Sequence, residues 1–277
     1  MLSVSMIVKN ESEMIRTALE SVKDADEIII VDTGSTDDTV KIAKEYGKVY
    51  RYKWNDNFAD ARNYSLSKCK HDWILVIDAD EKLISSIKDI KQKLKKTKKN
   101  SLSFKVGSKE IMNQVRVFKR DLKWKGAAHN YIDGADPEET DFRLEYGYSP
   151  AHNLDPDRTL RILLKHHDTP RDKFYLAREY LYRKDYITAL YWYEEYLKES
   201  TFKAEICEAY LQMARCKWAL KKGQEARNYL LKAIEGNPNF KEALLFMAEM
   251  SWPKQAEVWK KFAELATNED TLFIRGK

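Results

Sequence analysis

Short apolar runs alternate with amphipathic segments over the first 77 residues, and this alternation constrains the fold more than any other feature. The apolar runs are too short for buried helices, so they indicate strands. Strands that alternate with helices at this spacing form βαβ units, in which the strands lie parallel within one sheet. Strands and helices are expected in turn at residues 3–8, 12–22, 27–31, 37–46, 48–53, 59–69 and 73–77.

The pattern changes after residue 80. A lysine-rich helix is expected over residues 88–99, followed by strands near residues 102–106, 115–119 and 142–148. Residues 149–157 contain two prolines and several polar side chains, which indicates a connection between two parts of the chain.

The remainder of the chain predicts almost only helix, and it contains an internal repeat. An apolar residue followed by alanine recurs at Leu176-Ala177, Met213-Ala214 and Met247-Ala248, with the alanines 37 and 34 residues apart. These steps are close to the period of roughly 34 residues that is typical of tetratricopeptide helix pairs. A helical bundle without repeats is the alternative. We therefore predict an α/β domain with a Rossmann-like, mainly parallel sheet over residues 1–157, and an all-α, tetratricopeptide-like repeat domain over residues 158–277.

The predicted strand over residues 27–31 ends in a carboxylate, Asp32, and the chain then turns at Gly34. In open α/β sheets, ligands bind at the carboxyl ends of the strands. Ser35 or Thr36 is expected to cap the helix that follows. A plain strand–turn–helix connection would explain the cap but would leave Asp32 without a role.

The predicted strand over residues 73–77 delivers two carboxylates, Asp78 and Asp80, at the same edge of the sheet. Residues two apart on a strand-like path project to the same side, so these like charges repel each other. A hard divalent cation that also binds phosphate oxygens relieves the repulsion, which favours Mg²⁺ or Mn²⁺. A pair of solvated loop acids is the alternative.

Composition narrows the class of protein. Charged residues make up 34% of the chain and no apolar run approaches the roughly 20 residues of a membrane span, so a soluble protein without a membrane span is expected. The first residues predict a strand and not a signal peptide, and we expect a cytoplasmic protein. Three widely spaced cysteines indicate buried thiols. Glycine-rich phosphate loops are missing, and the lysine run lacks the aromatic residues of a nucleic-acid site.

Several short motifs occur in an order that is similar to one enzyme family: residues 4–11, Asp78-Ala79-Asp80, residues 124–129 and residues 146–152, ahead of the repeats. On these motifs the chain resembles family 2 glycosyltransferases of the GT-A fold, in the subgroup with C-terminal tetratricopeptide repeats. The resemblance implies an inverting, metal-dependent enzyme of the hexosyltransferase type. Its donor would be a nucleoside-diphosphate sugar, with a UDP-sugar favoured.

The resemblance also implies roles for individual residues. Asp32 would accept a hydrogen bond from the base, and Arg62 would lie near the base and diphosphate, although Arg62 could instead cap an exposed helix. Asp78 would bind ribose or a metal-bound water, Asp80 would ligate the metal, and His129 would be an additional ligand. The implied nucleotide-sugar contacts are Val8, Asn10, Glu11, Asp32, Gly34, Arg62, Asp78 and Ala79, and the implied metal set is Asp80, His129 and Asp78.

The acceptor half of the implied mechanism departs from the family pattern. The metal would neutralise the departing diphosphate while a carboxylate deprotonates the acceptor hydroxyl. The subgroup commonly has glutamate after the histidine, but this chain has Asn130, which cannot take a proton. Asp121, Asp133 and Asp136 are then the candidate bases, unless the acceptor itself ionises easily.

The resemblance leaves the acceptor and the role of the repeats open. The acceptor is expected to be a glycan, a lipid-linked sugar or a polypeptide, and the repeat domain is expected to dock it or to form a homodimer. The alternative function is a tetratricopeptide interaction scaffold whose GT-A domain binds nucleotide sugar but is catalytically weak.

Overall fold

The computed structural model describes residues 1–107, 111–147 and 155–267, and the chain divides into two compact units. They comprise Met1–Ile162 and Leu163–Lys277, so the division falls inside helix α5 (Arg158–Lys165). Most of the motif at residues 146–152 and the tail at residues 271–275 lie outside the described residues.

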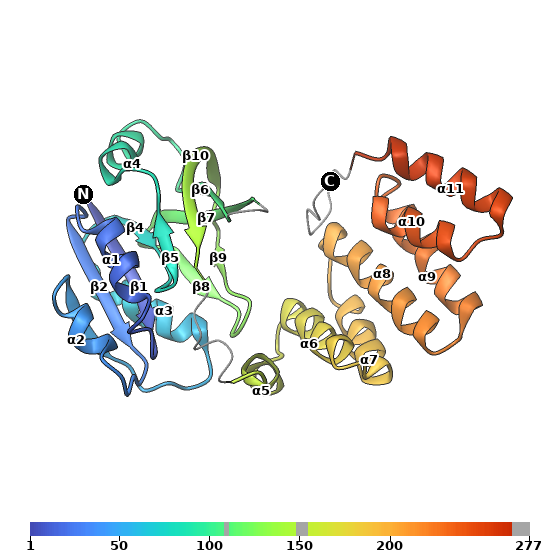
Figure 1. Cartoon of the computed structure of the whole chain (residues 1–277), viewed down its shortest axis with the longest axis horizontal. Coiled ribbons are helices and arrows are strands. Elements are labelled where there is room, and N and C mark those ends of the chain that lie inside the picture. Colours follow the sequence, from blue (N-terminus) through green and yellow to red (C-terminus); the bar gives the residue numbers. More distant parts are fainter. Residues whose placement is uncertain (108–110, 148–154, 268–277) are drawn as a thin grey trace. The chain divides into compact units, whose positions relative to one another are not determined.

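A mixed, mostly parallel sheet forms the centre of the first unit (Figure 1), in the strand order β3-β2-β1-β4-β7-β6-β10-β5. β1 pairs in parallel with β2 and β4, and β2 pairs in parallel with β3, as the alternation of strands and helices predicted. The α/β fold class is therefore confirmed. The strands are β1 (Leu2–Val8), β2 (Glu27–Asp32), β3 (Lys48–Arg51), β4 (Trp73–Val76), β5 (Glu81–Leu83), β6 (Ser101–Val106), β7 (Met112–Lys119) and β10 (Pro137–Tyr146).

Helices cover both faces of this sheet because the strands are apolar on both sides. Ile28 and Ile30 of β2 pack in one cluster with residues of the helices α1 (Ile15–Val22), α2 (Thr39–Ala43) and α4 (Ile87–Leu94). Ile29 packs in a second cluster with residues of α3 (Phe58–Lys68) and of the hairpin β8 (Lys123–Lys125) and β9 (Tyr131–Asp133). A shift of one residue would exchange the two faces, so this alternation fixes the register of the strands.

Strand β5 was not predicted from the sequence, and it matters for the site described below. It pairs antiparallel with the end of β10, so that Leu83 lies opposite Leu144 and Glu81 lies opposite Tyr146. β10 begins at Pro137, before the strand expected from the sequence. The pairing brings the chain that follows Asp80 alongside residues 146–147.

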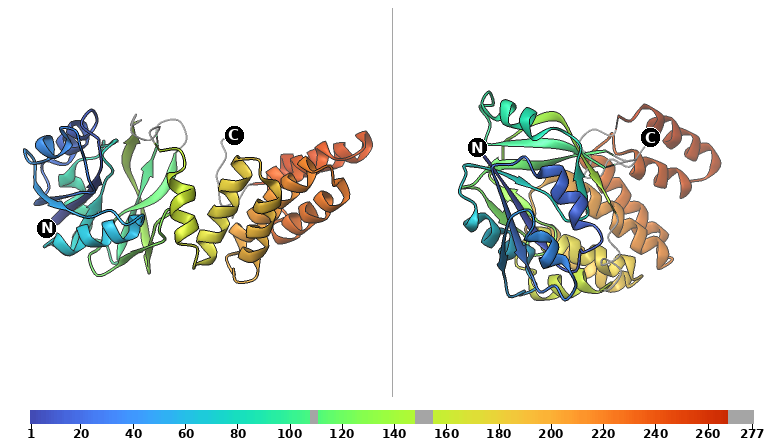
Figure 2. Two further views of the ribbon diagram at one scale, coloured as in Figure 1. Left: turned by 90° about the horizontal axis from the view of Figure 1, so that it is seen from below. Right: turned by 60° about the vertical axis from the view of Figure 1, so that its left-hand side comes forward.

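The second unit consists of helix pairs, as the repeat predicted (Figure 2). α6 packs on α7, α8 on α9, and α10 on α11. Ala177, Ala214 and Ala248, the alanines of the repeat, are buried among the paired helices. The tetratricopeptide-like organisation is thereby confirmed. The helices are α6 (Pro170–Tyr182), α7 (Tyr186–Leu197), α8 (Lys203–Ala219), α9 (Gly223–Gly236), α10 (Lys241–Glu249) and α11 (Pro253–Leu265).

Two expectations from composition can be compared with the structure. Cys69, Cys207 and Cys216 are buried free thiols, as expected. Burial raises the pKa of each of these thiols, so they resist ionisation. Over the described part of the chain, no helix combines the length and the apolar character that a membrane span requires.

Candidate functional site

A cavity of about 540 Å³ opens at the carboxyl edge of the parallel strands. Parallel strands end at the same edge of a sheet, so the loops after β1, β2 and β4 meet there. These loops supply one part of the lining, and the rest comes from the loop between β8 and β9, from the segment between Trp54 and Arg62, and from the start of α5. The lining residues are Ile7, Val8, Lys9, Asn10, Glu11, Thr33, Trp54, Phe58, Arg62, Asp78, Ala79, Asp80, Ala128, His129, Asn130, Asp155, Arg158, Thr159 and Arg161.

The turn after β2 is held by the carboxylate of Asp32. This side chain is only 4% exposed, and its Oδ1 accepts a hydrogen bond from the backbone N–H of Ser35 at 3.0 Å. The Ser35 hydroxyl in turn accepts the backbone N–H of Asn10 at 3.0 Å. Thr33 is the residue of this turn that lines the cavity, whereas Asp32 and Gly34 are not among its lining residues.

The prediction that Ser35 or Thr36 caps the next helix is wrong. α2 begins only at Thr39, and its N-cap residue makes no capping hydrogen bond through its side chain. The polar side chains of the segment bind the loop after β1 instead: the Thr39 hydroxyl accepts the Glu11 N–H at 2.7 Å, and Asp37 accepts the Ser12 N–H at 3.1 Å. Polar side chains that would suit a helix cap therefore fix the loop that carries Asn10 and Glu11 to the cavity.

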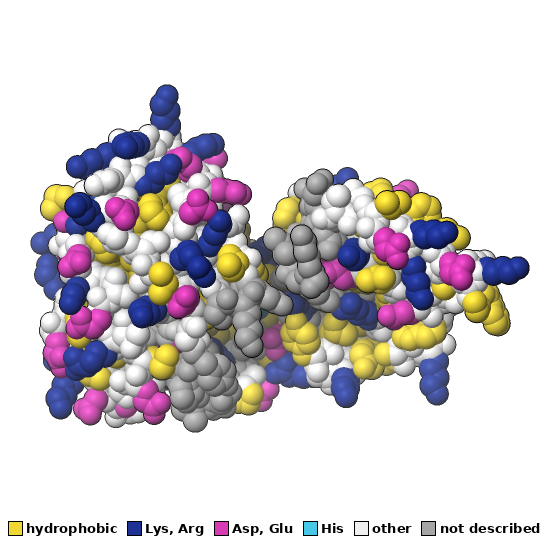
Figure 3. All heavy atoms as spheres, turned by 45° about the horizontal axis from the view of Figure 1, so that its top comes forward, with side chains coloured by type: hydrophobic (Ala, Val, Ile, Leu, Met, Phe, Trp, Pro, Cys, Tyr) yellow, Lys and Arg dark blue, Asp and Glu magenta, His cyan; other side chains and the backbone are white. Residues whose placement is uncertain are grey.

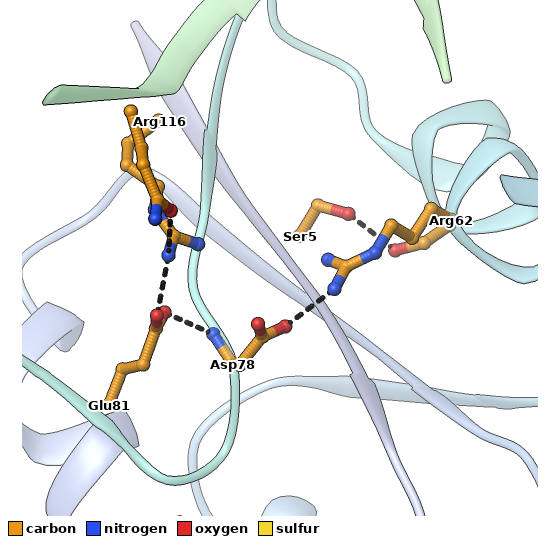
Figure 4. A network of polar contacts seen from close by, with 7 residues as sticks. Ser5, Arg62, Asp78, Glu81 and Arg116 are labelled. Atoms are coloured by element: carbon orange, nitrogen blue, oxygen red, sulfur yellow. Dashed lines mark hydrogen bonds and ion pairs between the residues drawn. The ribbon is translucent and has the colours of Figure 1, made fainter. Parts of the chain in front are cut away.

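Asp78 is held from two sides (Figure 4). Nη2 of Arg62 donates to its Oδ1 at 2.9 Å, and its backbone N–H donates to Oε2 of Glu81 at 2.8 Å. The Arg62 guanidinium also lies over the Trp124 ring, 4.8 Å from the centroid. Its buried Nε has no hydrogen-bond partner among the described residues, which leaves one donor of the guanidinium unused. Arg62 therefore points into the cavity and does not cap an exposed helix.

A buried ion pair lies directly behind this turn. Arg116 of β7 donates to Glu81 at 2.6 Å, and the side chains are 8% and 1% exposed. Burial, together with the nearby charge of Asp78, raises the pKa of Glu81, while Arg116 opposes that shift. The backbone N–H of Gly147 also donates to the Asp80 carbonyl. A side chain at Gly147 would place its Cβ 2.5 Å from that carbonyl oxygen, so this close approach requires glycine.

The loop that carries His129 is fastened to α3 and to itself. The Asn63 side chain donates to the Trp124 carbonyl at 3.0 Å and accepts the Trp124 N–H at 2.9 Å. Within the loop, the Asn130 side-chain amide donates to the Gly126 carbonyl. Gly126 has a φ of 86°, a conformation that glycine adopts without strain. A carboxylate could not donate this bond, so Asn130 has a structural reason to be an amide.

The predicted metal residues Asp78, Asp80 and His129 all line the cavity. Over the described residues, no three His, Cys, Asp or Glu side chains group closely enough to enclose an ion. An ion that also takes phosphate oxygens and water needs only one or two protein ligands. The side chains present therefore suit an ion that binds together with a diphosphate.

The predicted bases lie elsewhere. Asp133 pairs with Lys125 at 2.6 Å and Asp136 pairs with Lys99 at 2.7 Å. Asp121 lines a separate surface depression. None of the three belongs to the lining of the cavity, so the structure does not bring them together with Asp78 and Asp80.

The cavity also contains residues that sequence reasoning missed. Asp155, Arg158, Thr159 and Arg161 line it from the start of α5, a segment that the sequence assigned to the connection and the repeats. Trp54 and Phe58 form an aromatic part of the wall, with ring centroids 4.8 Å apart. The closely spaced arginines at the start of a predicted helix were the only local signal for this side of the site.

The chain matches the family described as Glycosyl transferase family 2 over residues 3–135. A TPR repeat-containing protein of Synechococcus elongatus is 50% identical over 84 residues, which are 30% of this chain and 21% of that protein. An uncharacterized glycosyltransferase of Rickettsia prowazekii is 44% identical over 89 residues, which are 32% of this chain and 30% of that protein. These matches span less than a third of the length of either relative.

Among solved structures, a fragment of TarS from S. aureus, crystallised with UDP-GlcNAc, aligns over 95% of this chain and 90% of that chain. The two are 13% identical and the TM-score is 0.46. The family match is the informative finding, because residues 3–135 include Arg62, Asp78, Asp80 and His129. Residues 3–135, which make up most of the α/β unit, therefore match glycosyl transferase family 2.

Proposed function

We propose that the chain is an inverting, metal-dependent glycosyltransferase. It moves a sugar from a nucleoside-diphosphate sugar, by family resemblance a UDP-sugar, to a glycan or polypeptide acceptor. The observation that carries the proposal is the convergence of Arg62, Asp78, Asp80 and His129 on one cavity, within the part of the chain that matches the family.

Asp80 and His129 would hold the divalent cation, Mn²⁺ or Mg²⁺, with Asp78 beside them. When bound, such an ion supplies Lewis-acid stabilisation to the charge that develops on the departing diphosphate. Arg62 orients the Asp78 carboxylate through its hydrogen bond and adds a positive charge at the same point.

The nucleotide is proposed to lie along the loops after β1 and β2. Val8, Asn10, Glu11 and Ala79 line the cavity there and are the proposed contacts. Asp32 and Gly34 would act within the turn that presents Thr33. The hydrogen bonds that tie this turn to the loop after β1 make the nucleotide wall rigid before the substrate arrives.

Asp121, Asp133 and Asp136 have little support as the general base, since they lie outside the cavity. Among the acids that line it, Asp155 accepts hydrogen bonds from Arg161, and these lower the pKa of Asp155. A lowered pKa keeps the carboxylate ionised but makes it a weaker base. We expect asparagine at position 121, 133 or 136 to leave the turnover rate within about twofold of wild type, because surface changes away from the site act weakly.

The test is the release of UDP from UDP-sugars in the presence of Mn²⁺. We expect Asp80→Ala to reduce the turnover rate on the order of a hundredfold or more, because an electrostatic contact to the leaving group is lost. Asp121→Asn is the matched control, since it removes a carboxylate outside the cavity. Wild-type protein that binds UDP but turns over no sugar nucleotide would support the alternative, an interaction scaffold.

The helical repeats offer a surface for docking an acceptor or for forming a homodimer. Apolar side chains are exposed on them (Figure 3), among them Tyr182, Ile187, Tyr191 and Trp252. Sedimentation of wild type and Trp252→Ala over a range of concentrations tests self-association. A monomer at every concentration would favour acceptor docking.

A further inference from the structure

One side of the cavity is positively charged, and the donor-side residues do not account for it. We call this side the basic flank and define it as Lys9, Arg158 and Arg161, all of which line the cavity. Arg161 binds Asp155 with both terminal nitrogens, at 3.1 and 2.7 Å. It also approaches Asp56, with Nε 3.6 Å from the carboxylate. Arg161 is therefore neutralised by neighbouring acids.

Lys9 and Arg158 are not neutralised in the same way. Neither forms an ion pair with a carboxylate of the described residues. The Arg158 guanidinium lies over the Phe58 ring, 5.4 Å from its centroid, which positions the cation without cancelling its charge. The hydrogen bond from Arg161 lowers the pKa of Asp155, and the charges of Arg158 and Lys9 lower it further, so three cations act on one carboxylate. A concave site that contains more cations than neighbouring carboxylates attracts an anion.

The position of Arg158 and Arg161 in the chain favours a role in binding the acceptor. Arg158 and Arg161 lie beyond residues 3–135, the part that matches the family, whereas Arg62, Asp78, Asp80 and His129 lie within it. The acid side of the cavity therefore lies within the part that matches the family, whereas two of the three residues of the basic flank come from the segment that leads into the helical repeats. A wall supplied by this segment suits recognition of the acceptor.

We propose that Lys9 and Arg158 bind an anionic group, a phosphate or a carboxylate, on the sugar acceptor. This rests on the proposed function, because it assigns a substrate class to the second half of the same cavity. Guanidinium groups bind both of these anions through two parallel hydrogen bonds, which gives Arg158 the more specific role and Lys9 the role of a point charge.

The experiment uses full-length protein saturated with UDP and Mg²⁺, so that the donor half is filled. Glycerol 3-phosphate is the anionic probe, glycerol is its neutral control, and potassium chloride matches the ionic strength. Binding is measured by titration calorimetry. We expect saturable binding of glycerol 3-phosphate to the wild type and none of glycerol.

The variants change the affinity in opposite directions. Arg158→Ala should weaken binding of the probe by roughly tenfold to a hundredfold, the usual loss of a charge-assisted contact. Asp155→Asn should strengthen it, because a competing carboxylate is removed and Arg161 is released. A variant that merely misfolded would not gain affinity. Lys123→Ala, which changes an exposed lysine outside the cavity, should leave the affinity unchanged.

Two results would overturn the proposal and one would overturn its foundation. If Arg158→Ala weakened UDP binding by the same factor as probe binding, the anion recognised would be the diphosphate of the donor. If the wild type ignored glycerol 3-phosphate while binding UDP, the basic flank would bind no such anion. Failure of the wild type to bind UDP at all would instead contradict the proposed glycosyltransferase function.

Discussion

The two flanks of the cavity are held in different ways. The acid flank, Asp78 and Asp80, is braced from behind by Glu81 and Arg116, whose side chains are 1% and 8% exposed. On the basic flank, Asp155 and Arg161 pair with exposed fractions of 42% and 44%. Breaking a buried ion pair is strongly destabilising, whereas exposed pairs contribute little. The acid flank is therefore preorganised by the interior, while the basic flank can adjust at the surface.

The largest expected effect comes from removing the support of the acid flank. Arg116→Leu should lower the free energy of unfolding of the α/β unit by about 3–5 kcal/mol, because it leaves Glu81 buried without its cation. Burial already raises the pKa of Glu81, and loss of Arg116 raises it further. The folded variant then holds a proton that the unfolded chain releases, so its stability falls as the pH rises from about 5 to 8. Urea denaturation at several pH values measures this.

A double variant provides the control for this experiment. Glu81→Gln combined with Arg116→Met removes both charges, while glutamine keeps an oxygen that can accept the Asp78 N–H. We expect the double variant to recover much of the stability that Arg116→Leu loses. Hydrogen exchange at the Asp78 amide reports directly on whether the Glu81–Arg116 pair supports this turn. An Asp78 amide that exchanges equally slowly in wild type and Arg116→Leu would contradict it.

The next largest effect is expected where Gly147 packs closely against the Asp80 carbonyl. Gly147→Ala places a Cβ 2.5 Å from the Asp80 carbonyl oxygen and 2.6 Å from Cε of Met14. The methionine can move at little cost, but the backbone oxygen can move only if Asp80 is displaced, so we expect a loss of about 1–3 kcal/mol. Weaker Mn²⁺-dependent binding of UDP, measured by calorimetry, should accompany the loss of stability.

Gly223→Ala is the matched control. It adds the same methyl group, but the new Cβ meets only the Trp218 ring at an ordinary distance of 3.5 Å. Alanine also favours helix, and Gly223 begins α9. Stability should stay the same or rise by up to about 1 kcal/mol. Equal losses of stability for Gly147→Ala and Gly223→Ala would show that the contact with the Asp80 carbonyl does not require glycine.

The acid flank was predictable from the sequence, but the contacts of Arg116 and Gly147 that support it were not. The carboxylates Asp78 and Asp80 follow an apolar strand, and a parallel sheet brings strand ends to one edge, so local pattern and topology were enough. Arg116 lies 35 positions from Glu81, and it meets Glu81 only because β7 pairs with β4 and β6. Gly147 meets Asp80 only through the β5–β10 pairing. Contacts between distant strands leave no periodicity in the sequence.

The two arginines of the basic flank escaped prediction for another reason. Arg158 and Arg161 belong to a helix whose pattern is that of the repeats, so their spacing gave no reason to place them at a ligand site. Only the packing of α5 beside Phe58 and Asp56 assigns them to the cavity. Similarly, Asn130 looked like a missing base in the sequence, whereas the structure gives its amide a partner in Gly126.

Asn130→Asp is expected to have a smaller effect on stability. It tests whether the Asn130 amide holds the loop of His129 in place. Aspartate cannot donate to the Gly126 carbonyl, and its oxygen would face another acceptor, so we expect a loss of about 1–2 kcal/mol. The turnover rate with UDP-sugar should fall, because the loop of His129 loosens. An increase in the turnover rate would mean that the chain does lack a base at this position.

The smallest expected effect lies on the basic flank and completes the contrast with Arg116. Arg161→Gln breaks the exposed pair with Asp155 and should barely shift the midpoint of urea denaturation at neutral pH, since water screens both groups. Arg161 lowers the pKa of Asp155, so whatever stability the pair contributes is present above the ordinary pKa of an aspartate and is lost as the pH falls. Any difference from wild type should therefore vanish in acid, and the loss for Arg116→Leu should shrink there too, because Glu81 is then protonated and needs no cation. A loss for Arg161→Gln as large as that for Arg116→Leu would mean that α5 is held as firmly as the acid flank, and the basic flank would then be rigid as well.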